Sequence, residues 1–405
     1  LCPTPAQEVV LRGHCGHARY VWNLAVEQHS WWTPRRGAAP GFVEQARQLT
    51  EARSVFPWLA AGSQTVQQQA LRDFAQGMKN FFAGTHGKPT WRKAGRDEGF
   101  QVVGCHAQKV KRLAKRVGRV WVPKAGWVRF RWSRKVPRAK SYRVTLDRAG
   151  RWHIAFAAIP EPVAAPGNGL TVGVDRGVAV SAALSTGELL TVPGLTPGQF
   201  GRLMRLHRRL AKAQPGSNRR ARLKAGIARL KARETDLRRD WVEQTSTHLA
   251  RSYDLIALED LKVGNMTRSA KGTVEQPGRG VAAKAGLNRR IPASGWGMLA
   301  KRLEDKAPGR MVRVDPAYTS QTCHRCGRVD ANSRKSHADF ACTSCGHREH
   351  ADVNAARNIV ARALDAQHTA QHVVAEFAAG HAVTARGGSG LPGPVNRELQ
   401  LAFTS

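Results

Sequence analysis

The segment Leu170-Thr171-Val172-Gly173-Val174-Asp175-Arg176-Gly177 is a short apolar run that ends in a carboxylate. Its composition favours a buried β-strand followed by a turn. A carboxylate at the end of such a strand is costly to desolvate unless a cation or hydrogen-bond donors lie nearby. Taken alone, Asp175 is more simply interpreted as a turn or cap residue. A second strand is expected over residues 178–184.

Two later segments repeat this combination of apolar structure and acid. The run Asp254-Leu255-Ile256-Ala257-Leu258-Glu259-Asp260 is an apolar strand that ends in a carboxylate, and Asp352 opens an expected helix over residues 351–363. Two acids on strands and one on a helix match a metal site of the RNase H-like type. Such a site holds two Mg²⁺ or Mn²⁺ ions about 4 Å apart. Spacing alone does not show that the acids meet, because Asp175 and Glu259 are far apart in the sequence.

The cysteines form a second candidate metal site. Cys323-His324-Arg325-Cys326 and Cys342-Thr343-Ser344-Cys345 give the pattern Cys-x2-Cys-x15-Cys-x2-Cys, and each pair is followed by a glycine. Four thiolates fill the tetrahedral positions of one Zn²⁺, which predicts a structural zinc ribbon. Two redox Cys-x-x-Cys motifs are the alternative, and they do not explain the paired glycines.

Composition narrows the class of protein. Of 405 residues, 65 are Lys or Arg and 29 are Asp or Glu, so the formal net charge is +36. This surplus of positive charge predicts a polyanionic partner, and it favours nucleic acid over an anionic membrane. The hydrophobic fraction of 41% excludes global disorder. No apolar run reaches the length of a transmembrane helix, and no secretory signal is expected in the first 20 residues.

The positive charge is concentrated in two segments. Residues 101–143 contain no acid, and basic residues there alternate with apolar and aromatic ones, which favours strands with one basic face. Residues 197–251 favour a helical hairpin, and its segment 201–240 is strongly basic. A solvated charged face is the simpler interpretation of each, but we expect contacts with nucleic acid. The residues expected to make them are Lys109, Lys111, Arg112, Lys115, Arg116, Arg129, Arg131, Arg219 and Arg220.

Three segments resemble the RuvC motifs of the TnpB (OrfB) proteins, which are encoded by bacterial insertion sequences. They are Gly173-Val174-Asp175-Arg176-Gly177, Leu258-Glu259-Asp260-Leu261-Lys262 with Asn265-Met266, and Asp352-Val353-Asn354-Ala355-Ala356-Arg357-Asn358-Ile359. The segments 294–297 and 316–323 also resemble parts of these proteins. The resemblance extends from Pro3 to about Ala363, although residues 267–288 align with nothing in the family.

The resemblance implies an RNA-guided DNA endonuclease with a multidomain α/β plus α+β fold. It implies an RNase H-like (RuvC) nuclease domain with an inserted zinc ribbon, preceded by a helical recognition and β-barrel-like wedge lobe. Asp175, Glu259 and Asp352 become the catalytic acids that bind two Mg²⁺ or Mn²⁺ ions, and Cys323, Cys326, Cys342 and Cys345 become the ligands of one zinc. The implied partners are a guide RNA from the element's own end and a double-stranded DNA target with a short adjacent motif. The expected location is the bacterial cytoplasm, at the nucleoid.

Six regions are expected along the chain. They are the N-terminal wedge strand and helical recognition region 1–90, the basic β-rich wedge region 91–165, the RuvC-like domain 166–316 with its helical hairpin 197–251, the zinc ribbon 317–350, the RuvC C-terminal helix 351–366, and a mobile tail 367–405.

Other functions remain open on these motifs. A compact type V CRISPR effector shares all of them, and a guide-dependent DNA-binding regulator would keep the fold without cutting. A strand-transfer transposase needs a His-hydrophobic-His motif and a tyrosine nucleophile, and the sequence has no His-x-His. A zinc-ribbon transcription factor would leave the three acids unexplained.

Overall fold

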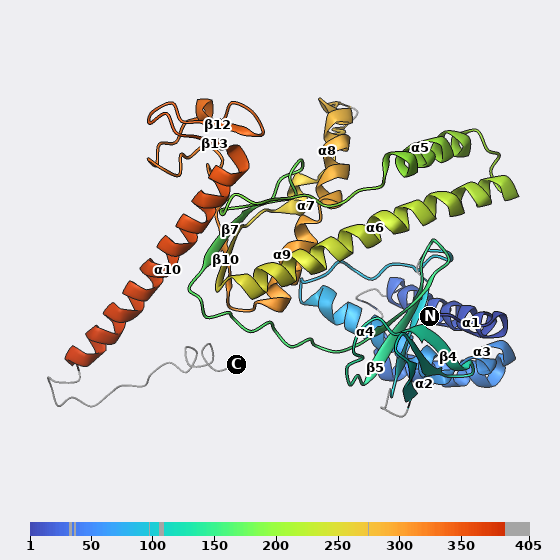
Figure 1. Ribbon diagram of the computed structural model, residues 1–405. Helices are drawn as coiled ribbons and strands as arrows, with labels where there is room; N and C mark the ends of the chain where they lie inside the picture. The colour runs from blue at the N-terminus through green and yellow to red at the C-terminus, as the bar shows by residue number, and fades with distance from the viewer. Residues whose placement is uncertain (32–34, 36–37, 97, 105–108, 274, 385–405) are drawn as a thin grey trace. The chain divides into compact units, whose positions relative to one another are not determined.

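The computed structural model describes residues 1–31, 35, 38–96, 98–104, 109–273 and 275–384, with side chains described as far as residue 369 (Figure 1). The chain divides into two compact units. The first comprises Leu1–Pro160 and Gly194–Asp236, and the second comprises Glu161–Pro193 and Leu237–Ser405. No described helix has the length and apolar character needed to cross a lipid bilayer.

The first unit begins with four helices, α1 (Pro5–Ser30), α2 (Phe42–Val55), α3 (Pro57–Ala61) and α4 (Gln64–Phe82). The start of α1 is fixed by a capping box. The Thr4 side chain accepts a hydrogen bond from the Gln7 backbone N–H, and the Gln7 side chain accepts one from the Thr4 backbone N–H. Such a box satisfies two of the backbone groups left open at a helix start. The buried face of α1, including Leu11 and Val21, packs in the same core as Phe74 of α4.

Two antiparallel three-stranded sheets complete that core. One has the order β1-β5-β6, from β1 (Gly99–Val103), β5 (Ser141–Leu146) and β6 (Trp152–Phe156). The other has the order β2-β3-β4, from β2 (Val110–Ala114), β3 (Val117–Val122) and β4 (Gly126–Arg131). In β3 and β4 buried residues alternate with exposed or half-buried ones, so the strands predicted from the alternating pattern are confirmed.

The predicted basic helices are α5 (Pro197–Ala211) and α6 (Asn218–Ser252). A turn around Pro215 separates them, and the two helices touch where Gly226 of α6 faces Leu206 of α5. The first part of α6 belongs to the first unit, and the part from Leu237 onward belongs to the second.

The second unit is built on a mixed five-stranded sheet of order β11-β10-β7-β8-β9. Three strands are parallel: β7 (Thr171–Asp175), β10 (Leu255–Glu259) and β11 (Met311–Val314). The antiparallel strands are β8 (Ala182–Leu184) and β9 (Leu189–Leu190). The strand expected over residues 178–184 is therefore shorter than predicted. The chain folds back on itself there, since a Cβ at Gly177 would lie only 2.6 Å from the carbonyl oxygen of Val180.

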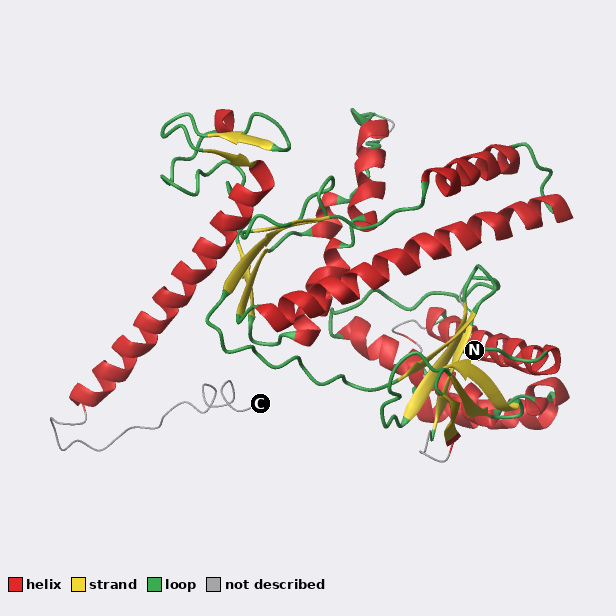
Figure 2. Ribbon diagram, in the orientation of Figure 1, coloured by secondary structure: helices red, strands yellow, loops and turns green. Residues whose placement is uncertain are grey.

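Helices cover both faces of this sheet. Ile256 and Leu258 of β10 pack in a core with α6 and with α9 (Trp296–Lys306), whereas Ala257 packs with Ile359 and Ala363 of α10 (Ala351–Thr384). Every residue of β10 is buried, as expected for a central strand covered on two sides. Figure 2 shows the yellow strands of this sheet with the long helix labelled α10 in Figure 1 beside them.

The contact between β7 and α10 is especially close. Gly173 has no side chain, and a Cβ there would lie 1.9 Å from the carbonyl oxygen of Ala356. A glycine at this position therefore lets the helix backbone approach the strand directly.

The remaining elements are short. α7 (Val263–Met266) and α8 (Val281–Ala293) follow β10, and the zinc-ribbon region contains a 3-10 turn (Ala331–Ser333) and the hairpin β12 (Asp339–Ala341) and β13 (Arg348–His350).

The last helix, α10, is longer than predicted. It continues to Thr384, so residues 367–384, which were expected to be part of a mobile tail, are helical. Their alanine content explains the difference, because alanine is the strongest helix former. The rest of the expected tail, 385–405, lies outside the described residues.

Candidate functional site

Asp175, Glu259 and Asp352 are brought to one place by three elements of the second unit. β7 ends at Asp175, and the parallel neighbouring strand β10 ends at Glu259. Because side chains alternate between the faces of a strand, both acids lie on the face that Ala257 shares with α10. Asp352 is in the first turn of α10. The fold thus places these acids, whose proximity the sequence could only suggest, near enough that the charges of Glu259 and Asp352 act on Asp175.

The three carboxylates influence one another electrostatically. Burial, together with the charges of Glu259 and Asp352, raises the pKa of Asp175 to about 7. Burial also raises the pKa of Glu259, against the opposing effect of a hydrogen bond from Thr319. Carboxyl groups that resist ionisation because of desolvation and like charges are a physical mark of a functional site.

Two arginines supply positive charge beside these acids. Arg334 Nη2 lies 3.0 Å from Asp352 Oδ1, and its charge lowers the pKa of Asp175. Arg176 is 5% exposed and donates to the backbone carbonyl of Glu259. Neither was predicted as a site residue. Arg176 did stand beside Asp175 in the sequence, but nothing in the pattern indicated that its side chain would be buried.

The four predicted cysteine ligands also converge. Their sulfur atoms all lie within 4.8 Å of one another, and the Sγ atoms of Cys323 and Cys345, like those of Cys326 and Cys342, are 3.7 Å apart. A tetrahedral Zn²⁺ with Zn–S bonds of about 2.3 Å needs sulfurs roughly 3.8 Å apart. The glycines after the two pairs have φ values of 73° and 69°, which permit the tight turns. The cluster therefore fits one structural zinc with no open position.

A second polar cluster lies next to the cysteines. His324 Nδ1 and His347 Nε2 lie 3.4 and 3.6 Å from Glu349 Oε2, and Arg357 Nη2 lies 2.9 Å from Glu349 Oε1. Arg357 Nη1 also donates to His324 Nε2 over 3.2 Å. Since the guanidinium already balances the carboxylate, the cluster acts as an ion-pair network that joins the zinc ribbon to α10.

The basic residues predicted to contact nucleic acid lie in the first unit, and their exposure differs. Lys111 Nζ lies 5.3 Å from the ring centroid of Trp127, which combines a cation with an aromatic face. Arg220 instead donates to the carbonyl oxygens of Leu210 and Ala213, 2.9 Å each, and so holds the end of α5. Lys109 and Arg220 are half-buried, and the exposed members are Lys111, Arg112, Lys115, Arg116, Arg129, Arg131 and Arg219.

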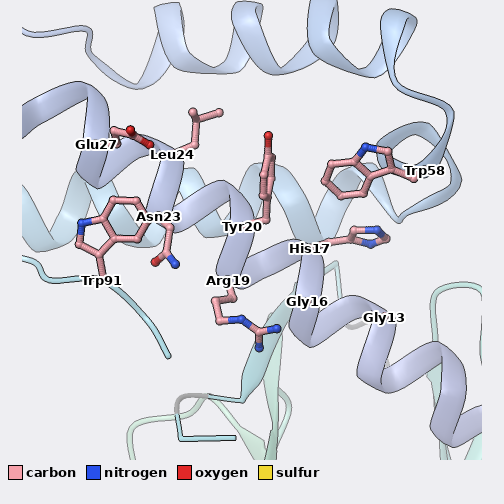
Figure 3. Close-up of a pocket in the computed structure, with 10 residues that line it drawn as sticks. All are labelled: Gly13, Gly16, His17, Arg19, Tyr20, Asn23, Leu24, Glu27, Trp58 and Trp91. Atoms are coloured by element: carbon pink, nitrogen blue, oxygen red, sulfur yellow. The ribbon is translucent and has the colours of Figure 1, made fainter. Parts of the chain in front are cut away.

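A cavity of about 570 Å³ lies along one face of α1 (Figure 3). Gly13 and Gly16 leave space at one end of this helix face, while Trp58 and Trp91 form parts of the wall. Tyr20 meets Trp58 edge to face, with ring centroids 4.9 Å apart. This cavity was not predicted from the sequence. The signal was the presence of Gly13, Gly16 and Tyr20 on one face of the first helix.

Three family models match parts of the chain. The model described as "Cas12f1-like, TNB domain" matches residues 296–359, which include the four cysteines and Asp352. The model described as "Probable transposase" (OrfB) matches residues 141–270, which include Asp175 and Glu259. A model described as "Helix-turn-helix domain" matches residues 1–37.

Relatives match nearly the whole length. A protein of Escherichia coli K12 named "Putative RNA-guided DNA endonuclease InsQ" is 35% identical over 373 residues, which cover 89% of this chain and 90% of the relative. A "Putative RNA-guided DNA endonuclease" of Streptomyces pristinaespiralis is 30% identical over 376 residues, with 90% and 88% covered. This chain therefore belongs to the TnpB (OrfB) family.

A comparison with solved structures identifies the fold. The structure titled "Cryo-EM structure of the Cas12f1-sgRNA-target DNA complex" matches with a TM-score of 0.53 at 14% identity. The match covers 87% of this chain and 83% of the other. The chain thus has the fold of the compact Cas12f1 nucleases, and it remains a member of the transposon-associated family.

Proposed function

We propose that this chain is an RNA-guided DNA endonuclease of the transposon-associated TnpB type, which hydrolyses phosphodiester bonds at Asp175, Glu259 and Asp352. The observation that carries the proposal is the convergence of these three carboxylates beside β7, β10 and α10. Family membership supplies the reaction class, since two relatives that match over almost their full length are named as RNA-guided DNA endonucleases.

The nuclease domain belongs in this proposal to the RNase H-like (RuvC) type, with the zinc ribbon inserted ahead of its last helix. The mixed sheet of β11, β10, β7, β8 and β9 supports this assignment, as does the position of two acids at the ends of adjacent parallel strands. The two small sheets of the first unit would form the wedge, and its helices the recognition lobe.

The acids fit divalent cations by their chemistry. Carboxylate oxygens are hard ligands of the kind that Mg²⁺ and Mn²⁺ prefer, and the raised pKa of Asp175 indicates a site that is short of positive charge. Two such cations, when bound, activate a water molecule and stabilise the leaving oxygen. Asp175, Glu259 and Asp352 would hold them, while Arg334 would orient the carboxylate of Asp352.

The partners are a guide RNA and a DNA target. The net charge of +36 and the exposed basic faces of β2 and β4 support binding to phosphate backbones. The Cas12f1 structure with the same fold is titled as a complex with sgRNA and target DNA. Guide RNA and protein would recognise different parts of the target: the guide RNA pairs with the target strand, and the protein recognises a short adjacent DNA motif. The reaction would take place on DNA of the bacterial nucleoid.

Plasmid cleavage tests the proposal. The protein is purified with RNA transcribed from its own 3′ flank and incubated with Mg²⁺ and a target library with randomised neighbouring bases. Cleavage that requires both a guide match and one flanking motif is the expected result. Tight guide-dependent binding without cleavage would contradict it and would favour a DNA-binding regulator.

A further inference from the structure

The turn that leads into the zinc ribbon contacts the proposed catalytic acids directly. β11 ends at Val314, and Thr319 lies in the turn that follows, four residues before the first zinc ligand. The Thr319 side chain is buried, with 2% of the residue exposed, and Glu259 is 7% exposed. A buried hydroxyl and a buried carboxylate must find their hydrogen-bond partners within the protein, because water does not reach either group.

Thr319 Oγ1 lies 2.5 Å from Glu259 Oε1, and its other possible acceptor, the carbonyl oxygen of Pro316, lies 3.0 Å away. A threonine hydroxyl has a single proton to donate. A bond to an ionised carboxylate is shorter and about twice as strong as a bond to a neutral carbonyl. The hydroxyl therefore donates to Glu259 and fixes one of its two oxygens.

The backbone around Thr319 is held by the helix that carries Asp352. The Asn358 side-chain amide donates to the carbonyl oxygens of Thr319 and Thr322, over 2.9 and 2.7 Å. Asn354, one turn earlier on α10, donates to the same carbonyl of Thr322 over 2.8 Å. Both asparagines are buried. Thr319 is thus anchored to α10 on one side and bonded to β10 on the other.

We propose that Thr319 is a positioning residue, which locks the Glu259 carboxylate in the orientation that binds the divalent cation together with Asp175 and Asp352. This inference rests on the proposed function and adds a residue to it. A terminal carboxylate torsion has broad, weakly separated wells, so a carboxylate without this bond would sample several orientations. Residues that orient a metal ligand typically affect metal affinity or activity by about 10-fold to 100-fold.

The test compares Thr319→Val, Thr319→Ser and Thr322→Val. Valine keeps the branched shape of threonine and removes the hydroxyl, whereas serine keeps the hydroxyl. Thr322 is a matched control in the same turn, because its hydroxyl donates to the backbone carbonyl of Tyr318 over 2.8 Å. Each protein is prepared as its RNA complex, and its zinc content and melting temperature are measured first.

Two readouts report on the cation site. One is the Mn²⁺ concentration for half-maximal cleavage in single-turnover reactions. The other is Mn²⁺ binding followed by electron paramagnetic resonance, with the Asp175→Ala complex as the background for sites on RNA. Thr319→Val is expected to raise the half-maximal Mn²⁺ concentration and to weaken binding by about 10-fold or more. Thr319→Ser and Thr322→Val are expected to stay within about 3-fold of the original protein.

Unchanged Mn²⁺ binding in Thr319→Val would overturn the proposal, and so would a Thr319→Ser variant as impaired as the valine variant. If the unaltered complex binds Mn²⁺ at the Asp175 site but does not cut DNA, the proposed nuclease function fails. In that case the binding readout still decides the role of Thr319.

Discussion

The zinc cluster and the three-acid site lie in the same unit and are built in opposite ways. The four cysteines come from two short knuckles close together in the sequence, and their sulfurs already have the spacing of a filled tetrahedron. The acids come from β7, β10 and α10, and the pKa of Asp175 is raised to about 7 by burial and by its neighbours. The cysteine site leaves no ligand position open and supports the local fold. The three-acid site forms only when β7, β10 and α10 have packed together.

The difference teaches where each site is vulnerable. Removing a ligand from the closed site should damage the local structure, because the region's own hydrophobic core around Phe340 is small and a bound zinc would supply much of its folding free energy. Removing a carboxylate from the open site should leave the fold intact or improve it, because the site is held together against charge repulsion.

The largest expected effect is on catalysis. Asp175→Ala or Glu259→Ala should reduce cleavage by about 10³-fold or more, as for residues that act as one catalytic unit. RNA and target binding should be nearly unchanged. Asp260→Ala is the matched control, since Asp260 follows Glu259 but pairs with Lys262 and Arg313. Single-turnover cleavage with binding measured in parallel checks this, and cleavage by Asp175→Ala at the normal rate would contradict it.

Removal of a zinc ligand comes next. Cys326→Ser should release the metal and unfold the ribbon, because a structural zinc contributes about 10 kcal/mol or more to the folding of such a module. Cleavage should be lost as well, since Arg334 and Thr319 reach the acids from this region. Zinc content by mass spectrometry and limited proteolysis between residues 323 and 345 measure the effect. Cys2→Ser, at an exposed cysteine outside the cluster, should change neither.

A third substitution tests the packing that brings the sites together. Gly173→Ala places a methyl group 1.9 Å from the carbonyl oxygen of Ala356 and should destabilise the protein by about 3 kcal/mol. Gly297→Ala in α9 is the control, because a Cβ there meets nothing within 4 Å. It should be neutral or stabilise by up to about 1 kcal/mol. Equal melting temperatures for the two variants would show that α10 lies farther from β7.

The smallest effect is on stability and depends on pH. The raised pKa of Asp175 means that the folded protein keeps a proton that the unfolded chain releases between about pH 4 and pH 7. Stability therefore falls across this range as pH rises, and the loss is complete above about pH 7. Without added divalent cation, Asp175→Asn should stabilise the protein at pH 8 by about 2 kcal/mol, and by much less at pH 5.

The control for this prediction has the opposite sign. Asp254 accepts from the backbone N–H groups of Gly167 and Gly169 over 2.8 and 2.6 Å, which lowers its pKa. Asp254→Asn should therefore destabilise the protein at pH 8. Thermal unfolding at the two pH values measures both variants. A lower melting temperature for Asp175→Asn at pH 8 would contradict the electrostatic picture.

The sequence predicted the parts of this molecule that depend on neighbouring residues. The apolar strands ending at Asp175 and Glu259 were correct, because burial on both faces leaves a continuous hydrophobic run. The cysteine cluster was correct because knuckle spacing fixes ligand geometry locally. The strand over 178–184 was predicted too long, because the close approach of Gly177 to Val180 depends on the turn and not on hydrophobicity.

What the sequence did not predict involves partners that are distant along the chain. Thr319 and Glu259 are 60 residues apart, and their bond exists only because α10 holds the intervening turn. Arg334 forms an ion pair with Asp352 because the fold of the zinc ribbon brings the two together. In the sequence, nothing distinguished Arg334 from the other basic residues around it. The cavity along α1 needs Trp58 and Trp91, from other parts of the chain, to lie against this helix, which the helix periodicity alone does not specify.

The contact between Gly173 and Ala356 has a consequence for synthesis of the protein. β7 and β10 are translated long before α10, so a nascent chain holds two of the three acids while the last one is still inside the ribosome. Only when Asp352 and the turn of helix beyond it have emerged is the helix able to dock on the strand and complete the set. Chains that end before residue 351 therefore keep all residues of the first unit and of β7 and β10, but they lack Asp352 and the helix that packs on β7.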